Sequence, residues 1–131
     1  MALSGFFKTL FGGSDTAEPI ADLPVNDTKH PNPVYDNLPG NLFKKDFQAN
    51  KNAVLLDVRT AMEVRSGALP GAVHIDIMSP SFAAKIAALD RGKTYFIYCR
   101  SGNRSAQACQ IMHRQGFDVR NLMGGISAWP R

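Results

Sequence analysis

Cysteine is scarce in this chain: only two of its 131 residues are cysteines, Cys99 and Cys109. Two thiols exclude the disulfide framework of small secreted domains, so we expect a reduced, cytoplasmic protein whose thiols serve chemistry rather than structure. Neither charge nor hydropathy is extreme. With 44% hydrophobic and 20% charged residues and a mean hydropathy of -0.17, the composition excludes a fibrous or fully disordered protein.

Other signals are also missing from the sequence. It has no internal repeat and no low-complexity segment, and its length allows one domain with a substantial core but not two ordinary ones. No stripe of basic and aromatic residues points to nucleic acid as a partner. His74 and His113 lack partners at metal-ligand spacing, so we expect no metal site.

The first 40 residues differ in composition from the rest. They hold five of the eight prolines together with several glycines, which predicts a flexible, proline-rich tail at residues 1–40. Apolar residues within this tail recur at helical spacing and indicate a short amphipathic helix over residues 3–11. The apolar positions are Leu3, Phe6, Phe7, Leu10 and Phe11. Such a helix can fray, pack on a protein surface or touch a membrane interface; we favour the frayed tail, because so short a helix is marginal in water.

From residue 41 onward, strand and helix signals alternate, which predicts a compact α/β domain over residues 41–131. The strand signals are the apolar run 53–58, the segment 72–77 and the β-branched and aromatic run 94–98. The helix signals lie between and after them. They are a segment with Leu42, Phe43 and Phe47, a short one capped by Thr60, one with Phe82, Ile86 and Leu89, and one from Ala106 that ends at Gly116.

The loop that follows the strand 94–98 begins at Cys99 and is small, polar and glycine-containing. Ligands of α/β sheets bind at the carboxyl ends of strands, and the backbone N–H groups of such a loop can form an anion-binding cradle at the start of the next helix. Arg100 and Arg104 add positive charge, so we expect the pKa of Cys99 to lie below that of a free thiol. Alternatively, Cys99 is a buried apolar residue and the two arginines are solvated; the combination of Cys, Gly, Ser and two Arg favours chemistry.

The net charge of +4 is concentrated after this cysteine. Basic and acidic residues balance over residues 1–98, whereas residues 99–131 hold five arginines and one aspartate. The arginines are Arg100, Arg104, Arg114, Arg120 and Arg131, and the aspartate is Asp118. This imbalance indicates a positive field near the thiol that favours a small anion.

Three stretches of the sequence resemble the single-domain rhodaneses, which are sulfurtransferases. They are residues 55–59 (LLDVR) followed by Glu63, residues 67–75 (GALPGAVHI), and residues 98–105 (YCRSGNRS) followed by Gly116-Phe117 and residues 124–129 (GGISAW). The chain departs from the family pattern at Ala68, where His is usual, and at Asp76, where Pro is common. Neither departure lies in the cysteine loop.

The resemblance implies a three-layer α/β/α fold with a central, mostly parallel sheet, and a thiosulfate sulfurtransferase activity. The thiolate of Cys99 would take a sulfane sulfur from a small anionic donor, thiosulfate or a persulfide, and pass it as a persulfide to a thiol or cyanide. No cofactor or metal is needed, because sulfur itself is the group carried. The loop residues that would bind the substrate are Arg100, Ser101, Gly102, Asn103, Arg104 and Ser105.

Within this loop, Arg104 would hold the oxyanion of the donor and Arg100 would steer anions from the rim. Three residues outside the loop are expected to brace the site: Asp57 at the end of a strand, and Arg59 with Glu63. Because Arg59 and Glu63 are four residues apart, we expect them to form a structural ion pair.

Two other functions use a reactive cysteine. A phosphatase or arsenate reductase also pairs a low-pKa Cys with an Arg, but such enzymes resemble C-x5-R, whereas this chain has C-x4-R and no evident general acid. A rhodanese-like binding module could use Cys99 for redox sensing, although such modules typically lose the cysteine. Cys109, inside the predicted helix, is expected to be a buried packing residue rather than a second reactive thiol.

Overall fold

The structure of the chain, a computed structural model, describes residues 35–131. The predicted helix over residues 3–11 and the predicted tail as far as residue 34 lie outside the described residues, so both stay predictions. No helix within residues 35–131 is long and apolar enough to cross a membrane.

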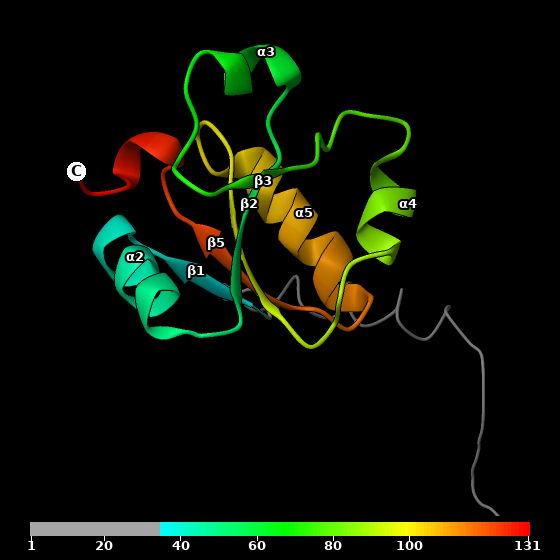
Figure 1. The fold of residues 1–131 in the computed structure, drawn as a ribbon, viewed down its shortest axis with the longest axis horizontal. Coiled ribbons are helices and arrows are strands. Elements are labelled where there is room, and N and C mark those ends of the chain that lie inside the picture. The colour runs from blue at the N-terminus through cyan, green and yellow to red at the C-terminus, as the bar shows by residue number, and fades with distance from the viewer. Residues whose placement is uncertain (1–34) are drawn as a thin grey trace, which may run out of the picture. The chain divides into compact units, whose positions relative to one another are not determined.

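A parallel β-sheet forms the centre of the domain (Figure 1). Every pair of neighbouring strands is parallel, and the strand order is β1-β5-β4-β2-β3. The register places Asp57 opposite Tyr98 and Ile97 opposite Asn121, so the carboxyl ends of the three central strands share one edge of the sheet. The strands are β1 (Asp36–Leu38), β2 (Ala53–Asp57), β3 (Val73–His74), β4 (Thr94–Tyr98) and β5 (Asp118–Leu122).

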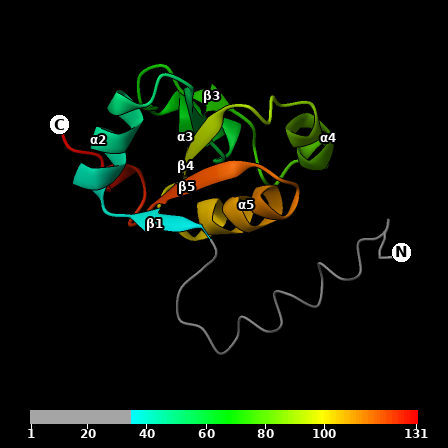
Figure 2. The ribbon, with the colours of Figure 1, turned by 90° about the horizontal axis from the view of Figure 1, so that it is seen from below.

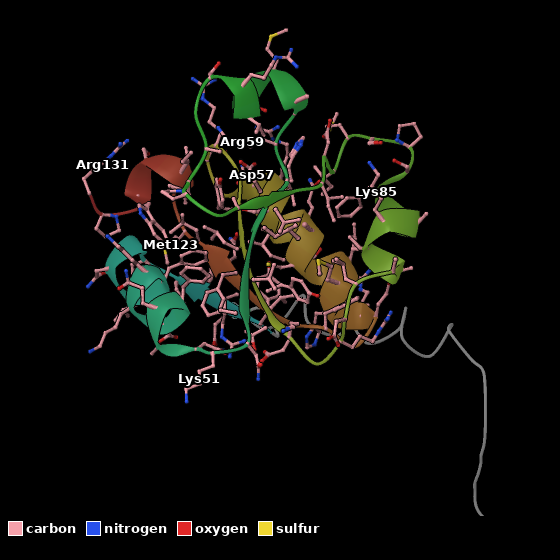
Figure 3. The ribbon with its side chains drawn as sticks, in the orientation of Figure 1. Lys51, Asp57, Arg59, Lys85, Met123 and Arg131 are labelled. Carbon is pink, nitrogen blue, oxygen red and sulfur yellow. The ribbon has the colours of Figure 1, made fainter. Side chains whose placement is uncertain are left out.

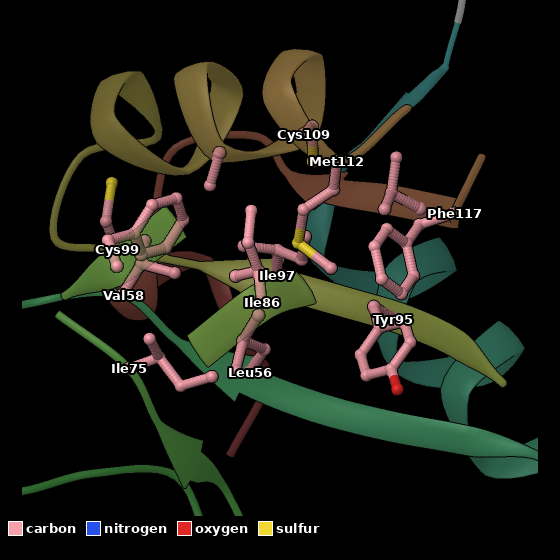
Figure 4. Close-up of a cluster of buried hydrophobic side chains, with 13 residues drawn as sticks. Leu56, Val58, Ile75, Ile86, Tyr95, Ile97, Cys99, Cys109, Met112 and Phe117 are labelled. Carbon is pink, nitrogen blue, oxygen red and sulfur yellow. The ribbon is translucent and has the colours of Figure 1, made fainter. Parts of the chain in front are cut away.

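Helices cover both faces of this sheet, and α2 and α5 lie on opposite sides of it (Figure 2). Side chains of α4 and α5 join one buried cluster, in which Ile86, Ile97 and Met112 are fully buried (Figure 4). Side chains of α2 and η2 pack on the other face around Phe43, Phe96 and Leu122. The helices are α2 (Gly40–Ala49), α3 (Ala61–Arg65), α4 (Phe82–Ala87), α5 (Asn103–Arg114) and the 3-10 helix η2 (Ile126–Ala128). The predicted three-layer α/β/α fold is thereby confirmed.

Local sequence explains the best-defined elements. All five residues of β4 are buried, as expected for a β-branched and aromatic strand covered on both faces. Thr60 caps α3 as predicted: its side chain accepts a hydrogen bond from the Glu63 N–H, and the Glu63 carboxylate accepts one from the Thr60 N–H. Beyond α5, Gly116 has a φ of 92°, a left-handed conformation that ends a helix at low cost in glycine.

The sheet differs from the sequence prediction at its edges. Strand β1 lies before residue 41, where the sequence indicates the start of the domain, and pairs with β5, a strand that the sequence did not indicate. At the other edge, β3 has two residues rather than the predicted run 72–77. There Asp76 starts a turn, because its side chain accepts from the Met78 N–H and its carbonyl from the Ser79 N–H.

Phe43 tests the packing of α2 on the sheet. Its ring is fully buried and meets Phe96 edge-on at 5.4 Å and Trp129 at 6.1 Å between ring centroids. We predict that Phe43→Ala lowers the free energy of unfolding by about 3–5 kcal/mol in urea denaturation, because the cavity cannot be refilled. Leu42→Ala is the control: this neighbour is 45% exposed, and its loss should cost less than about 1 kcal/mol. Equal losses would contradict the packing.

Candidate active site

Cys99 follows the last residue of β4, and its side chain lies against the N-terminus of α5. Its side chain has no exposed surface, and its sulfur accepts hydrogen bonds from the Gly102 N–H at 3.0 Å and the Ser105 hydroxyl at 3.3 Å. Burial raises the pKa of Cys99, but the hydrogen bonds from Ser105, Gly102 and Ser101 outweigh it and hold the pKa below its usual range. The thiolate is therefore stabilised mainly by polar groups of its own loop.

The other loop residues divide into an exposed group and a buried group. Arg100, Ser101 and Asn103 are exposed, whereas Gly102 and Ser105 are buried beside the sulfur. Gly102 is the N-cap of α5 and has a φ of 102°, which only glycine adopts readily. This conformation lets its N–H donate to Cys99 while its carbonyl accepts from the Ala106 N–H in the first turn of α5.

The loop rests on the backbone of the segment that follows β5. The Ile126 N–H donates to the Cys99 carbonyl at 2.8 Å. A Cβ atom on Gly125 would lie 1.9 Å from the Arg100 carbonyl oxygen, a distance that no side chain tolerates. Gly125, which the sequence supplied only as part of a resemblance, is thus required by the close approach of two backbones.

Arg104 is held by α3. Its guanidinium donates to both oxygens of Glu63, at 2.8 and 2.9 Å, and this bidentate geometry is typical of strong Arg–carboxylate pairs. The hydrogen bonds from Arg104 and Thr60 lower the pKa of Glu63 to about 2. The expected ion pair between Arg59 and Glu63 is wrong, because Arg59 precedes the N-cap Thr60 and turns away from α3.

Arg59 instead pairs with Asp57 in a buried network at the carboxyl ends of β2 and β4 (Figure 3). The Asp57 carboxylate is fully buried and accepts from Arg59 at 2.7 Å and from the Tyr98 hydroxyl at 2.7 Å. Arg59 also donates to the Gly67 carbonyl, and the Tyr98 oxygen accepts from the Leu69 N–H. Burial, with the hydrogen bond to Asp57, raises the pKa of Tyr98 to about 12, so this phenol stays protonated.

Tyr98 was not singled out as a site residue from the sequence, where it appears as a strand residue and as the first residue of the stretch 98–105 that carries the resemblance. Its position next to Cys99, in a strand whose neighbour ends in a buried Asp, is the signal that could have identified it. Through Tyr98 and Arg59, the network ties the ends of β2 and β4 to the connection between α3 and β3. Asp57 and Arg59 thus lie at the strand end from which the loop starts, and Glu63 contacts the loop through Arg104.

Cys109 lies on the buried side of α5, further along the helix from Cys99 (Figure 4). It has no exposed surface, and burial raises the pKa of Cys109 above its usual range. Such a thiol stays protonated and packs as a small apolar side chain. Within residues 35–131, no group of three or more His, Cys, Asp or Glu side chains is placed to hold a metal ion.

The site therefore combines a thiol of lowered pKa, inward-facing peptide N–H groups and an arginine at the start of a helix. This combination stabilises a sulfur anion and the negative charge that develops when the sulfur attacks or leaves.

Comparison with known proteins agrees with this geometry. The model of the family described as Rhodanese-like domain matches residues 41–131. YtwF of Bacillus subtilis is 40% identical over 87 residues, which cover 66% of this chain and 82% of that protein. Thiosulfate sulfurtransferase GlpE of Pseudomonas savastanoi is 39% identical over 80 residues, which cover 60% of this chain and 74% of GlpE. A rhodanese-like domain protein from Staphylococcus aureus is similar in structure, with a TM-score of 0.64 and 26% identity over 72% of this chain and 91% of that one. The chain belongs to the rhodanese-like domain family.

Proposed function

We propose that the chain is a sulfurtransferase in which Cys99 carries a sulfane sulfur from thiosulfate or a similar donor to a thiol or cyanide. The observation that carries this proposal is the Cys99 sulfur, which accepts hydrogen bonds from its own loop at the N-terminus of α5 and has a lowered pKa. A thiolate is the nucleophilic form of cysteine, and the loop stabilises it without any group outside the chain.

The reaction has two steps on one sulfur atom. The Cys99 thiolate attacks the outer sulfur of thiosulfate, the S–S bond of the donor breaks, and sulfite leaves with the electron pair. Cys99 then carries a persulfide. An acceptor thiolate or cyanide attacks the terminal sulfur of this persulfide. The S–S bond of the persulfide breaks, and Cys99 keeps the electron pair and returns to a thiolate. The N–H groups of Ser101 and Gly102 would hold the anionic sulfur in both steps.

Access to the sulfur requires the loop to open, because Cys99 has no exposed surface. The exposed residues Arg100, Ser101 and Asn103 form the outer part of the loop, so these are the residues that would have to shift for a donor to reach the sulfur. Arg100 and Arg104 supply positive charge at this entrance, which would attract an anionic donor. Cyanide and an acceptor thiolate are anions too, so the same field would attract the acceptor as well as the donor.

The phosphatase alternative is less favoured by the C-x4-R spacing of the loop. The Arg104 guanidinium is engaged with both oxygens of Glu63, so its contact with a donor oxyanion or with phosphoryl oxygens would need this ion pair to open. Burial of Cys99 does not separate the redox-sensing alternative from sulfur transfer, because peroxide and thiosulfate both need access to the sulfur. The products formed on Cys99 distinguish the two functions.

Two cysteine variants test the proposal. Wild-type protein incubated with thiosulfate should gain the mass of one sulfur atom, lose it on addition of cyanide and release thiocyanate. Cys99→Ser should gain no sulfur and make no thiocyanate, because the nucleophile is gone. The matched control, Cys109→Ser, changes a buried thiol of raised pKa and should retain both reactions. The measurements are intact mass spectrometry and a thiocyanate assay.

The result that would overturn the proposal is a wild-type protein that gains no sulfur, or a Cys99→Ser variant that transfers sulfur equally well. Hydrolysis of an aryl phosphate by the wild type and not by Cys99→Ser would support the phosphatase instead. A Cys99 that forms a sulfenic acid with peroxide but no persulfide with thiosulfate would support the redox sensor.

The ion pair between Glu63 and Arg104 would fix the C-terminal half of the loop. It joins α3 to α5 across the site, and both side chains are about three-quarters buried, with 24% and 27% of their surface exposed. The hydrogen bond from Arg104 to Glu63 raises the pKa of the guanidinium, and the charge of Cys99 raises it further. Arg104 would thus act from a fixed position.

This ion pair predicts a pH-dependent contribution to stability. The pKa of Glu63 is lowered to about 2 in the folded state and lies near 4.3 in an unfolded chain. The contribution is complete above about pH 5 and is lost as the pH falls toward 2. The difference in unfolding free energy between wild type and Glu63→Gln should therefore shrink over that range in urea denaturation. Arg104→Gln, which removes the other partner, should give the same trend, and a difference independent of pH would contradict the assignment.

A further inference from the structure

Asn121 is a buried amide under the cysteine loop. It lies on β5, one residue before the strand ends, and is 2% exposed. Its side-chain NH2 donates to the Gly102 carbonyl, a long hydrogen bond of 3.4 Å, and to the Asn37 side-chain oxygen at 2.8 Å. Asn37 lies directly opposite on β1 in the parallel register. A chain of two amides thus joins the edge strand β1 to the N-cap of α5.

The orientation of this pair follows from its neighbours. A backbone carbonyl can only accept, so the NH2 of Asn121 faces Gly102, and Asn37 must then present its oxygen to the same NH2. The other end of the amide, Asn121 Oδ1, is buried and has no hydrogen-bond partner among residues 35–131. A buried polar atom without a partner lowers stability, and an apolar residue would avoid that cost. The asparagine at this position is therefore explained by the hydrogen bonds that its side-chain NH2 donates.

The Asn121 NH2 contacts Gly102, the residue whose N–H donates a hydrogen bond to the Cys99 sulfur. Gly102 donates its N–H to Cys99 at 3.0 Å and starts α5 with its carbonyl, at a φ of 102°. A Cβ at Gly102 would lie 3.2 Å from the Gly124 nitrogen, so the backbone here is tightly packed. A hydrogen bond that holds the Gly102 carbonyl consequently restricts how far its N–H can turn from the sulfur.

We propose that Asn121, oriented by Asn37, is a positioning residue that holds Gly102 in place against Cys99. Strand β1 is then part of the catalytic architecture although it lies outside residues 41–131, which the family model matches. The inference rests on the proposed function in one respect: it assumes that the reactivity of the Cys99 thiolate is what the position of Gly102 serves.

The experiment measures the alkylation of Cys99 by iodoacetamide as a function of pH, with the modified peptide identified by mass spectrometry. Asn121→Leu removes the donor to Gly102, and Asn37→Ala removes the oxygen that orients it. Both variants should move the midpoint of the alkylation profile upward by about half a pH unit, because a weaker Gly102–Cys99 hydrogen bond stabilises the thiolate less. The charged groups near the thiol, Arg104 with Glu63 and Arg100, are unchanged in both variants.

Asp36→Ala is the matched control on β1. Asp36 contacts Arg120 at 3.4 Å and not Asn121, so its loss weakens the attachment of β1 without touching the amide pair. Its alkylation midpoint should equal that of the wild type, while melting temperatures report stability for all three variants. Asn37 is exposed, so Asn37→Ala carries the test even if Asn121→Leu does not fold.

The proposal is overturned if Asn37→Ala melts at a lower temperature but keeps the wild-type midpoint, since Asn37 would then be merely structural. It is also overturned if Asp36→Ala shifts the midpoint as far as Asn37→Ala does. Both outcomes are independent of sulfur transfer. If the wild type takes no sulfur from thiosulfate, the proposed function is wrong. The alkylation midpoints of the variants would still decide whether Asn121 positions Gly102.

Discussion

The buried carboxylate of Asp57 is the constraint on which the carboxyl edge of the sheet depends. A charge without exposed surface is costly unless it is paired and fully hydrogen-bonded, and Asp57 meets this need with Arg59 and Tyr98. These partners in turn bind the Gly67 carbonyl and the Leu69 N–H. One charge therefore orders the ends of two strands and the connection that follows α3, so the cysteine loop starts from a fixed point.

The loop itself is supported differently on its two sides. On the side of α3, side-chain charges hold it through the pair of Glu63 and Arg104. On the side of β5, backbone holds it: the Ile126 N–H binds the Cys99 carbonyl, and Gly125 lies against Arg100. Salt and acid weaken the first support, but the second has no charge to screen. The loop thus has one adjustable side and one fixed side.

The sequence predicts those parts of the fold whose local pattern has one explanation. Strands β2 and β4 are apolar runs, and the cap of α3 is a Thr followed three residues later by Glu. Strand β5 was missed because Asp118, Arg120 and Asn121 interrupt its apolar pattern, and β1 has three residues, two of them polar. Tertiary pairing rather than propensity makes both of them strands.

The candidate site shows the same division. The Cys99 loop could be identified from residue types alone, because its chemistry lies within seven consecutive residues. The partner of Arg59 could not be predicted, since helical spacing suggested Glu63, whereas Arg59 precedes the helix and pairs with Asp57.

The support that residues 121–126 give to the loop has a consequence during synthesis. A ribosome makes this segment after Cys99, so the hydrogen bonds that residues 121–126 give to the loop can form only when the last strand has been synthesised and has docked.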